Sequence, residues 1–118
     1  MMRPIASVGV ENIGLEQIEG VLAQQREYAE FLERHGLTKA GGDILLRVAW
    51  SLANGKKPCV TDICLLVDYP RTTALRYIAM LEEQALIQRE RDVHDRRRWL
   101  VNLTPKGSTA IQRHLRTS

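Results

Sequence analysis

Residues 87–107 read IQRERDVHDRRRWLVNLTPKG, and this stretch decides the fold. Ile87–Arg91 reads as a short strand, residues 92–95 turn the chain, and a second strand is expected at about residues 97–103. Apolar residues that alternate with polar ones beyond a turn are typical of a β-hairpin. The side chains expected to point inward from the second strand are Trp99, Val101 and Leu103.

The residues before this hairpin predict a tight pair of helices. Thr61 is expected to cap a brief helix that runs from residue 62 to about residue 67. Residues 68–70 form a turn, and Pro70 suits the first turn of a second helix over about residues 70–84. A helix pair followed by a two-stranded hairpin is the winged-helix order. The residues expected on the inner face of the second helix are Ala74, Ile78 and Leu81.

Two longer helices are expected nearer the N-terminus. Apolar residues recur at three- and four-residue steps over residues 15–35, which predicts an amphipathic helix ended by Gly36. Thr38 is expected to cap a further helix that closes at residues 54–55. Residues 57–60 contain a proline and read as an edge strand. The apolar stripe of the first helix consists of Leu15, Ile18, Leu22, Ala29 and Leu32.

We therefore expect a mainly α chain with a small β-hairpin wing, an α+β winged helix-turn-helix. Its 118 residues, 44% of them hydrophobic, suit one unit with its own core. Residues 1–36 would form an N-terminal arm and a dimerisation helix, and residues 37–104 the winged helix-turn-helix. Residues 105–118 would add a short C-terminal helix to the same unit, anchored by Ile111 and Leu115.

The charge of the chain is unevenly distributed. The formal net charge is +3, but residues 1–35 carry three basic and six acidic side chains. From Arg96 to the end there are six basic residues and no acidic one. Such a basic half favours a polyanionic partner, although a solvated surface can look the same. Charge alone leaves both interpretations open.

The helix pair and the hairpin resemble those of MarR-type transcriptional regulators. Residues 63–87 resemble the family's helix-turn-helix, including the helix end Leu81-Glu-Glu-Gln-Ala-Leu86. Asp95-Arg-Arg97 and Leu103-Thr-Pro-Lys-Gly107 match the family's wing in residue and spacing. The resemblance spans about residues 37–107. It implies a transcriptional regulator, expected to be a repressor, that binds double-stranded DNA in a sequence-specific way.

The first half of the 70–84 helix carries the candidates for base contacts. A helix fits the major groove, where base edges carry a distinct pattern of donors and acceptors. The planar donors of arginine can bond two acceptors of a guanine or a phosphate at once. Alternatively, the arginines are ordinary exposed residues that pair with Asp68 or Glu83. The candidates are Arg71, Thr72, Thr73 and Arg76.

The hairpin loop carries the second group of candidates. The resemblance implies that Arg97 reaches a minor groove, whose negative potential favours a guanidinium, and that Asp95 braces it. Arg96 and Arg98 flank the same loop and are expected to bind phosphates. The alternative is a solvated hairpin in which Asp92 and Asp95 merely offset the arginines.

Three further residues are secondary candidates for contact with DNA. A hydroxyl at a helix start can hold a phosphate, but Thr61 can equally be a simple cap. Lys106, at the start of the final helix, offers a further cation. Tyr69 and Pro70 stand where the family commonly has a small polar cap, so Tyr69 either touches the DNA backbone or packs on the core.

Other function classes compete with DNA binding as interpretations of this sequence. A winged-helix metal or redox sensor would use Cys59 and Cys64, but a closed zinc site wants about four ligands and no histidine stands near them in the sequence. A winged-helix interaction module without a DNA role would not need both a basic helix and a basic wing. The sequence shows no arrangement typical of an enzyme and implies no cofactor. We expect the cytoplasm as its location, since no signal peptide or apolar span is visible.

The family resemblance also implies a homodimer. The helix over residues 15–35 would carry most of the interface, with help from residues 105–118. Two-fold symmetry in turn predicts an operator that is an inverted repeat with half-sites about one helical turn apart. A small-molecule effector remains open, and the short C-terminal helix predicts a weak pocket or none.

Overall fold

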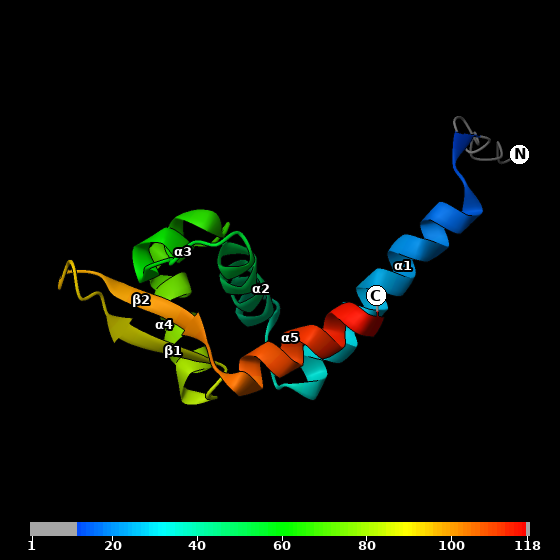
Figure 1. The fold of residues 1–118 in the computed structure, drawn as a ribbon. Coiled ribbons are helices and arrows are strands. Elements are labelled where there is room, and N and C mark those ends of the chain that lie inside the picture. The colour runs from blue at the N-terminus through cyan, green and yellow to red at the C-terminus, as the bar shows by residue number, and fades with distance from the viewer. Residues whose placement is uncertain (1–11, 118) are drawn as a thin grey trace, which may run out of the picture.

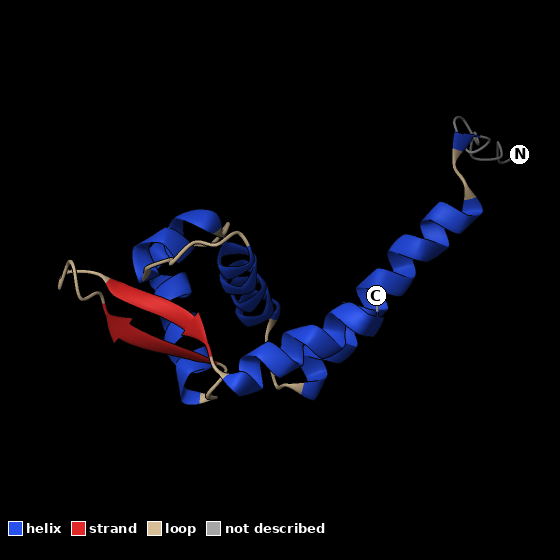
Figure 2. Cartoon of the chain, in the orientation of Figure 1, coloured by secondary structure: helices blue, strands red, loops and turns tan. Residues whose placement is uncertain are grey.

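The computed structural model describes residues 12–117 and has the expected winged helix-turn-helix architecture (Figures 1 and 2). Within this range, three helices precede the second helix of the helix-turn-helix, and one more follows the hairpin, which lies against the helical body. The elements, in chain order, are α1 (Leu15–Arg34), α2 (Lys39–Ala53), α3 (Val60–Leu66), α4 (Arg71–Glu83), β1 (Ile87–Arg91), β2 (Trp99–Leu103) and α5 (Pro105–Thr117).

The hairpin is antiparallel, with Ile87 opposite Leu103 and Arg91 opposite Trp99. The predicted edge strand at residues 57–60 is reduced to one bridge between Cys59 and Leu100. The second strand begins at Trp99, two residues later than expected, because residues 92–98 form the loop. Trp99 is 41% exposed, so its expected inward orientation is wrong.

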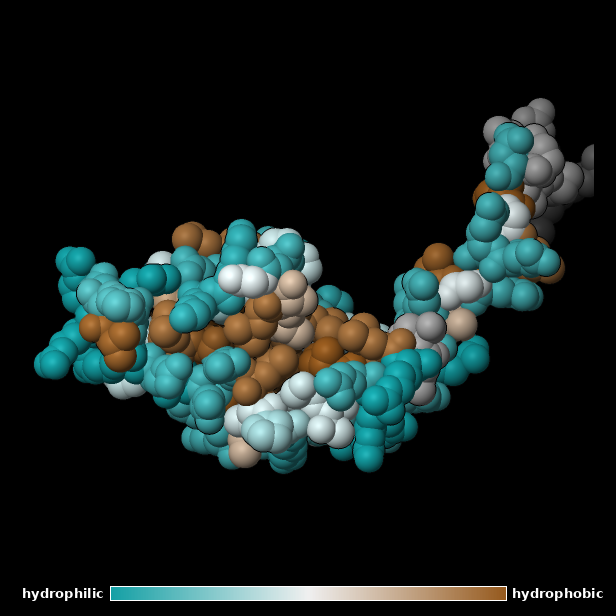
Figure 3. Space-filling model, in the orientation of Figure 1, coloured by the Kyte–Doolittle hydropathy of each residue, from teal (hydrophilic) through white to brown (hydrophobic). Residues whose placement is uncertain are grey.

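The core lies between α2, α3, α4 and the hairpin. The expected inner face of α4 is buried, as is Val101 of β2. An apolar band is visible across one face of the body (Figure 3). Burial of this side-chain area is the main favourable term for the fold. The largest fully buried side chains include Ile44, Leu45, Ile63, Ile78, Leu81, Leu86 and Ile87.

Helix ends follow the sequence in most places. The Thr38 hydroxyl accepts a hydrogen bond from the Gly41 amide at 3.1 Å, as an N-cap should. Gly36 ends α1 with a φ of +61°, in the left-handed region that glycine adopts without strain. Thr61 is not the cap of α3. That helix starts at Val60, with Cys59 as its N-cap, because the Asp62 carboxylate accepts from the Cys59 amide at 2.9 Å.

Helix α1 extends well beyond the body (Figure 1). Its C-terminal part packs through Phe31, which is buried, and α5 lies alongside it. Leu15, Ile18 and Leu22 are 69%, 43% and 51% exposed. On α5, Ile111 is buried as expected, but Leu115 is 61% exposed and anchors nothing in this chain. In the described part of the chain, no helix combines the length and apolar character needed to cross a membrane.

Candidate nucleic-acid interface

Helix α4 presents one polar face outward. Arg71, Thr72 and Arg76 are exposed, and Thr73 at the margin is half-buried. The helix is amphipathic at 3.6 residues per turn, so burial of its Ala74 face turns these side chains to solvent. The Arg76 guanidinium lies 5.1 Å from the centre of the Tyr77 ring and donates to its hydroxyl at 3.4 Å. Arg76 therefore rests on Tyr77, and among the described residues it forms no ion pair with Asp68 or Glu83, the pairing that the alternative interpretation required.

The wing loop is held in shape by its own aspartates. The Asp92 carboxylate accepts from the His94 amide at 2.8 Å, and the Asp95 carboxylate accepts from the Arg97 amide at 3.1 Å. The backbone closes the loop, since the Arg98 amide donates to the Asp95 carbonyl at 2.9 Å. These bonds fix the direction in which the loop side chains leave the backbone.

Arg97 projects from this loop with its side chain 90% exposed. Its Nε lies 3.1 Å from Oδ1 of Asp95. The hydrogen bond from the Arg97 side chain holds the pKa of Asp95 below its ordinary value. Asp95 is thus ionised beside Arg97, in the bracing position that the resemblance implied. A cation on a closed loop, with its guanidinium already oriented, suits insertion into a groove of negative potential.

Arg98 differs from its neighbours because it points back to the protein. Its guanidinium lies 3.2 Å from Asp92, which is buried, and 3.4 Å from Asp62 of α3. The wing is therefore fastened to the helix-turn-helix by Arg98. Arg96 is exposed, and its carbonyl accepts from the Arg91 guanidinium at 2.5 Å.

A second ion pair fastens the hairpin to α4. The Arg89 guanidinium on β1 binds both carboxylate oxygens of Glu82, at 2.8–3.2 Å. Two-pronged pairs of this kind fix orientation as well as distance. The side-chain hydrogen bonds from Arg89 hold the pKa of Glu82 below its ordinary value. The sequence alone does not link Glu82 to Arg89, because the two residues belong to different elements, α4 and β1, and meet only in the folded chain.

Comparison with known proteins bears on this geometry. The family model for a winged helix DNA-binding domain matches residues 46–107, which is more than half of the chain. The chain belongs to the winged helix DNA-binding domain family. The match includes both α4 and the hairpin, so α4 is the recognition helix of the domain and residues 92–98 are the tip of its wing.

Solved structures of winged helix proteins share this fold. A MepR–DNA complex of S. aureus superposes with a TM-score of 0.71 at 20% identity, covering 86% of this chain and 79% of that one. MarR gives a TM-score of 0.63 at 23% identity, covering 89% of this chain and 75% of that one. The fold is therefore the one implied by the resemblance to MarR-type proteins.

A curated relative has a name that points to gene regulation. It is a protein of Thauera aromatica, named as a transcriptional regulatory protein for the hcr operon, and it is 27% identical over 101 residues. The match takes in 86% of this chain but 59% of the relative. The chain thus spans less than two thirds of the relative's length.

The secondary candidates have mixed surroundings in the winged helix domain. Thr61 is exposed in the first turn of α3. The Lys106 ammonium donates to the Gln84 carbonyl at 2.9 Å, at the opposite end of the recognition helix from Arg71. The Tyr69 hydroxyl donates to the Asp43 carboxylate at 2.6 Å. The structure therefore joins neither Lys106 nor the Tyr69 hydroxyl to the cluster on the recognition helix.

The two cysteines of the domain are both free thiols and both buried. Among residues 12–117, no three His, Cys, Asp or Glu side chains gather in a way that could hold a metal ion. Cys59 caps α3 and Cys64 packs in the core. Their positions fit small apolar side chains.

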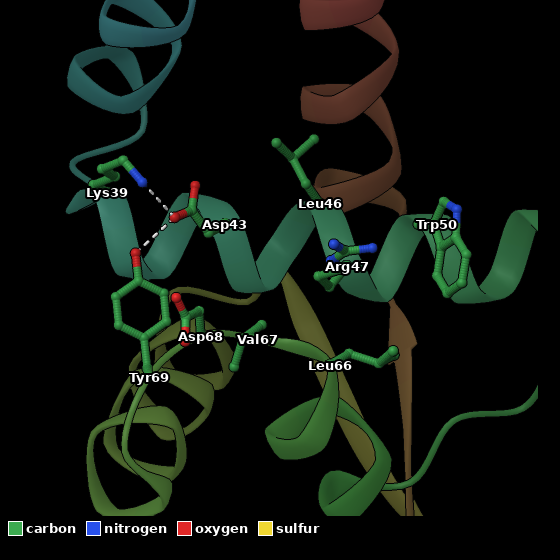
Figure 4. Close-up of a pocket in the computed structure, with 9 residues that line it drawn as sticks. All are labelled: Lys39, Asp43, Leu46, Arg47, Trp50, Leu66, Val67, Asp68 and Tyr69. Carbon is green, nitrogen blue, oxygen red and sulfur yellow. Dashed lines mark hydrogen bonds and ion pairs between the residues drawn. The ribbon is translucent and has the colours of Figure 1, made fainter.

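An open hollow of about 720 Å³ lies beside the recognition helix (Figure 4). Its walls come from α2 and from the turn between α3 and α4, and both acidic and basic side chains reach it. No residue of α5 lines this hollow. The expectation of a weak effector pocket was based on the shortness of α5. The lining residues are Lys39, Asp43, Leu46, Arg47, Trp50, Leu66, Val67, Asp68 and Tyr69.

Proposed function

We propose that this chain binds double-stranded DNA in a sequence-specific way and acts as a transcriptional regulator, most simply as a repressor. The observation that carries the proposal is the pairing of two cationic elements in one winged helix domain. The recognition helix exposes Arg71, Thr72 and Arg76, and the wing projects an Arg97 that is 90% exposed. The name of the Thauera aromatica relative supports the regulatory part.

In this proposal the recognition helix lies in the major groove. Arg71 and Arg76 supply guanidinium forks for guanine or phosphate, and Thr72 and Thr73 supply short hydroxyls. Arg76 rests on a neutral Tyr77 ring, from which it can swing to a base without leaving a buried carboxylate unpaired. Arg76 is therefore the residue we expect to read a base.

The wing supplies the minor-groove contact. Arg97 enters the groove, Asp95 orients it, and the exposed Arg96 binds a phosphate. Arg98 is better explained as the fastening of the wing, since it binds Asp92 and Asp62. Thr61 remains a candidate for a phosphate contact, whereas the hydrogen bonds of Tyr69 and Lys106 favour positions within the protein.

The same proposal includes a homodimer on an inverted repeat. A single winged helix covers little DNA, and pairing two half-sites is a common route to tight and selective binding. The exposed apolar side chains of α1, together with Leu115 on α5, supply a surface for a second copy. They are Leu15, Ile18, Val21 and Leu22. The domain division at residues 36 and 104 is proposed on the same basis.

The test is binding-site selection from a random duplex pool, followed by affinity measurements on the selected duplex. We expect Arg76→Ala to weaken binding by about 5- to 150-fold and to relax the preference at one base pair. Arg97→Ala should weaken binding most on duplexes with A·T pairs beside the core site. Arg47→Ala, which changes an exposed arginine on α2, is the matched control. If the first two variants bind like the control while folded, the assignment of the interface is wrong.

A further inference from the structure

Asp43 gathers side chains from three separate parts of the chain. Its carboxylate accepts from the Tyr28 hydroxyl of α1 at 2.5 Å and from the Tyr69 hydroxyl at 2.6 Å. Lys39, one turn earlier on α2, donates to it at 2.9 Å. Figure 4 shows Tyr69 and Lys39 converging on this carboxylate at the edge of the hollow. A single side chain on α2 thus connects α1 to the turn before the recognition helix.

The α1 side of this connection is tightly fixed. A Cβ placed on Gly42 would lie 2.3 Å from Cδ2 of Leu32 and 2.7 Å from the Tyr28 hydroxyl. Helix α1 therefore crosses α2 at the smallest possible residue. The Tyr28 ring also lies 5.8 Å from the His114 ring of α5. Because Tyr28 belongs to α1 and its ring contacts α5, a shift of either helix would move the Tyr28 hydroxyl.

The recognition helix is packed on the core through Ala74, Ile78 and Leu81, but its first turn has no side-chain cap. Tyr69 lies in the four-residue connection, 67–70, between α3 and α4, and Pro70 is the N-cap of α4. Proline has no side-chain group that can cap a helix, and within the described residues no side chain takes that role at α4. The Ala74 amide donates to the Pro70 carbonyl at 2.9 Å and begins the helix. The Tyr69 hydroxyl therefore ties the start of the recognition helix to α2.

The protonation states suit this arrangement. Burial disfavours the charged form of Asp43, but hydrogen bonds from Tyr28, Tyr69 and Lys39 outweigh it and hold the pKa of Asp43 below its ordinary value. Burial and the Asp43 hydrogen bond raise the pKa of Tyr28, and the Asp43 hydrogen bond raises the pKa of Tyr69. Both tyrosines thus stay donors to one carboxylate, which makes each bond charge-assisted and strong.

We propose that Asp43 is a positioning residue that couples the placement of α1 to the placement of the recognition helix. This inference rests on the proposed DNA binding for its consequence, since α1 is also the proposed dimer helix. A shift of α1 would move Tyr28, alter the bonds at Asp43 and release or hold Tyr69. Tyr69, which stands where the family commonly has a small polar cap, thereby has a role in positioning the recognition helix.

The experiment is a double-mutant cycle with Tyr28→Phe and Tyr69→Phe, measured as affinity for the selected duplex. Tyr28 lies on α1, away from the recognition-helix and wing arginines, so a purely local role leaves DNA affinity unchanged. We expect each variant to bind about fivefold more weakly, a typical size for coupling between sites. The double variant should bind about as weakly as either single one, because either change breaks the same connection. Asn54→Ala is the control, since it removes an exposed side-chain hydrogen bond that stays at the C-terminal end of α2, the one from Asn54 to the Trp50 carbonyl.

A second measurement keeps the inference separate from DNA binding. Hydrogen exchange at the Ala74 amide should become faster in Tyr28→Phe and in Asp43→Asn, while exchange at the Asp92 amide in the wing stays unchanged. If the parent chain binds no duplex but the Ala74 amide responds, the proposed function fails and the coupling stands. The coupling is overturned if Tyr28→Phe leaves the Ala74 amide unchanged, or if the duplex is bound and the effects of the two tyrosine changes simply add.

Discussion

Gly107 shows how one residue joins the hairpin to the last helix. A Cβ at this position would lie 2.0 Å from the Leu86 carbonyl oxygen and 2.9 Å from the Leu86 carbonyl carbon. Both are backbone atoms and cannot rotate away. The Leu86 carbonyl also accepts from the Thr104 amide at 3.1 Å, which brings the two segments together. The glycine that ends the wing motif is thus required by a close backbone approach.

Gly107→Ala should therefore lower the free energy of unfolding by about 2 kcal/mol or more, the cost of forcing atoms into a filled site. Gly20→Ala is the matched control. Gly20 is in the middle of α1 with nothing near its added Cβ, so alanine there should raise the free energy of unfolding by about 0.5–1 kcal/mol. Urea unfolding of both variants checks the pair, and equal losses of stability would show that the close approach at Leu86 is not what matters.

Some residues could be placed from the sequence and others could not. Thr38 was predicted to be an N-cap, and its hydroxyl accepts from the amide three residues on, as the local capping rule requires. The prediction that Thr61 caps α3 is wrong, because the N-cap lies two residues earlier, at Cys59, whose amide donates to the Asp62 carboxylate. The connection at Asp43 gave no signal, since its two tyrosine partners lie 15 and 26 residues away.

At the scale of elements, the hairpin is held on the helices by ion pairs as well as by its buried Val101. Arg89 joins β1 to Glu82 of α4, and Arg98 binds Asp92 within the wing tip and joins the tip to Asp62 of α3. Of three consecutive arginines in the wing, two project outward and one points inward. Sequence periodicity predicted the hairpin but could not separate Arg98 from Arg96 and Arg97, because their partners are set by the folded loop.

Arg98→Ala should loosen the wing, because it leaves the buried Asp92 carboxylate without its guanidinium. We expect a lower thermal unfolding midpoint and faster hydrogen exchange at the Asp92 amide, which donates to the Arg98 carbonyl at 3.0 Å. Arg96→Ala, two residues earlier and exposed, should leave both quantities unchanged and weaken DNA binding alone. The opposite pattern, with Arg96→Ala destabilising and Arg98→Ala neutral, would reverse the two assignments.

At the scale of the whole molecule, α1 is the feature that one chain alone does not explain. The chain measures 70 × 28 × 26 Å, and much of the long dimension is α1. In the sequence, the apolar stripe of this helix suited a dimer interface and the chain's own core equally well. The structure divides it, since Leu32 packs against the core while Leu15, Ile18 and Leu22 stay exposed. Leu115 is exposed and not an anchor for the same reason, because an apolar stripe in a sequence does not show whether it packs on its own chain or faces outward.

Ile18→Glu combined with Leu22→Glu should convert a dimer to a monomer, since two charges would have to be buried in an apolar seam. The molar mass measured by light scattering should fall from twice the 13.4 kDa chain mass to the chain mass itself. Gln17→Glu combined with Gln24→Glu adds the same charge to α1 off the stripe and should leave the mass unchanged. If the parent chain is already a monomer at tens of micromolar, the dimer prediction is wrong and the exposed stripe must face another partner.

The central claim is that the recognition helix and the wing bind the phosphates and bases of double-stranded DNA. The measurement that tests it most directly is the salt dependence of affinity for the selected duplex. Each phosphate neutralised by an arginine or lysine releases counterions, so log affinity should fall linearly with log salt, with a slope of about −0.9 per contact. We expect a steep loss of affinity between low and physiological salt. Affinity that does not change with salt, or the absence of duplex binding at low salt, would contradict the account.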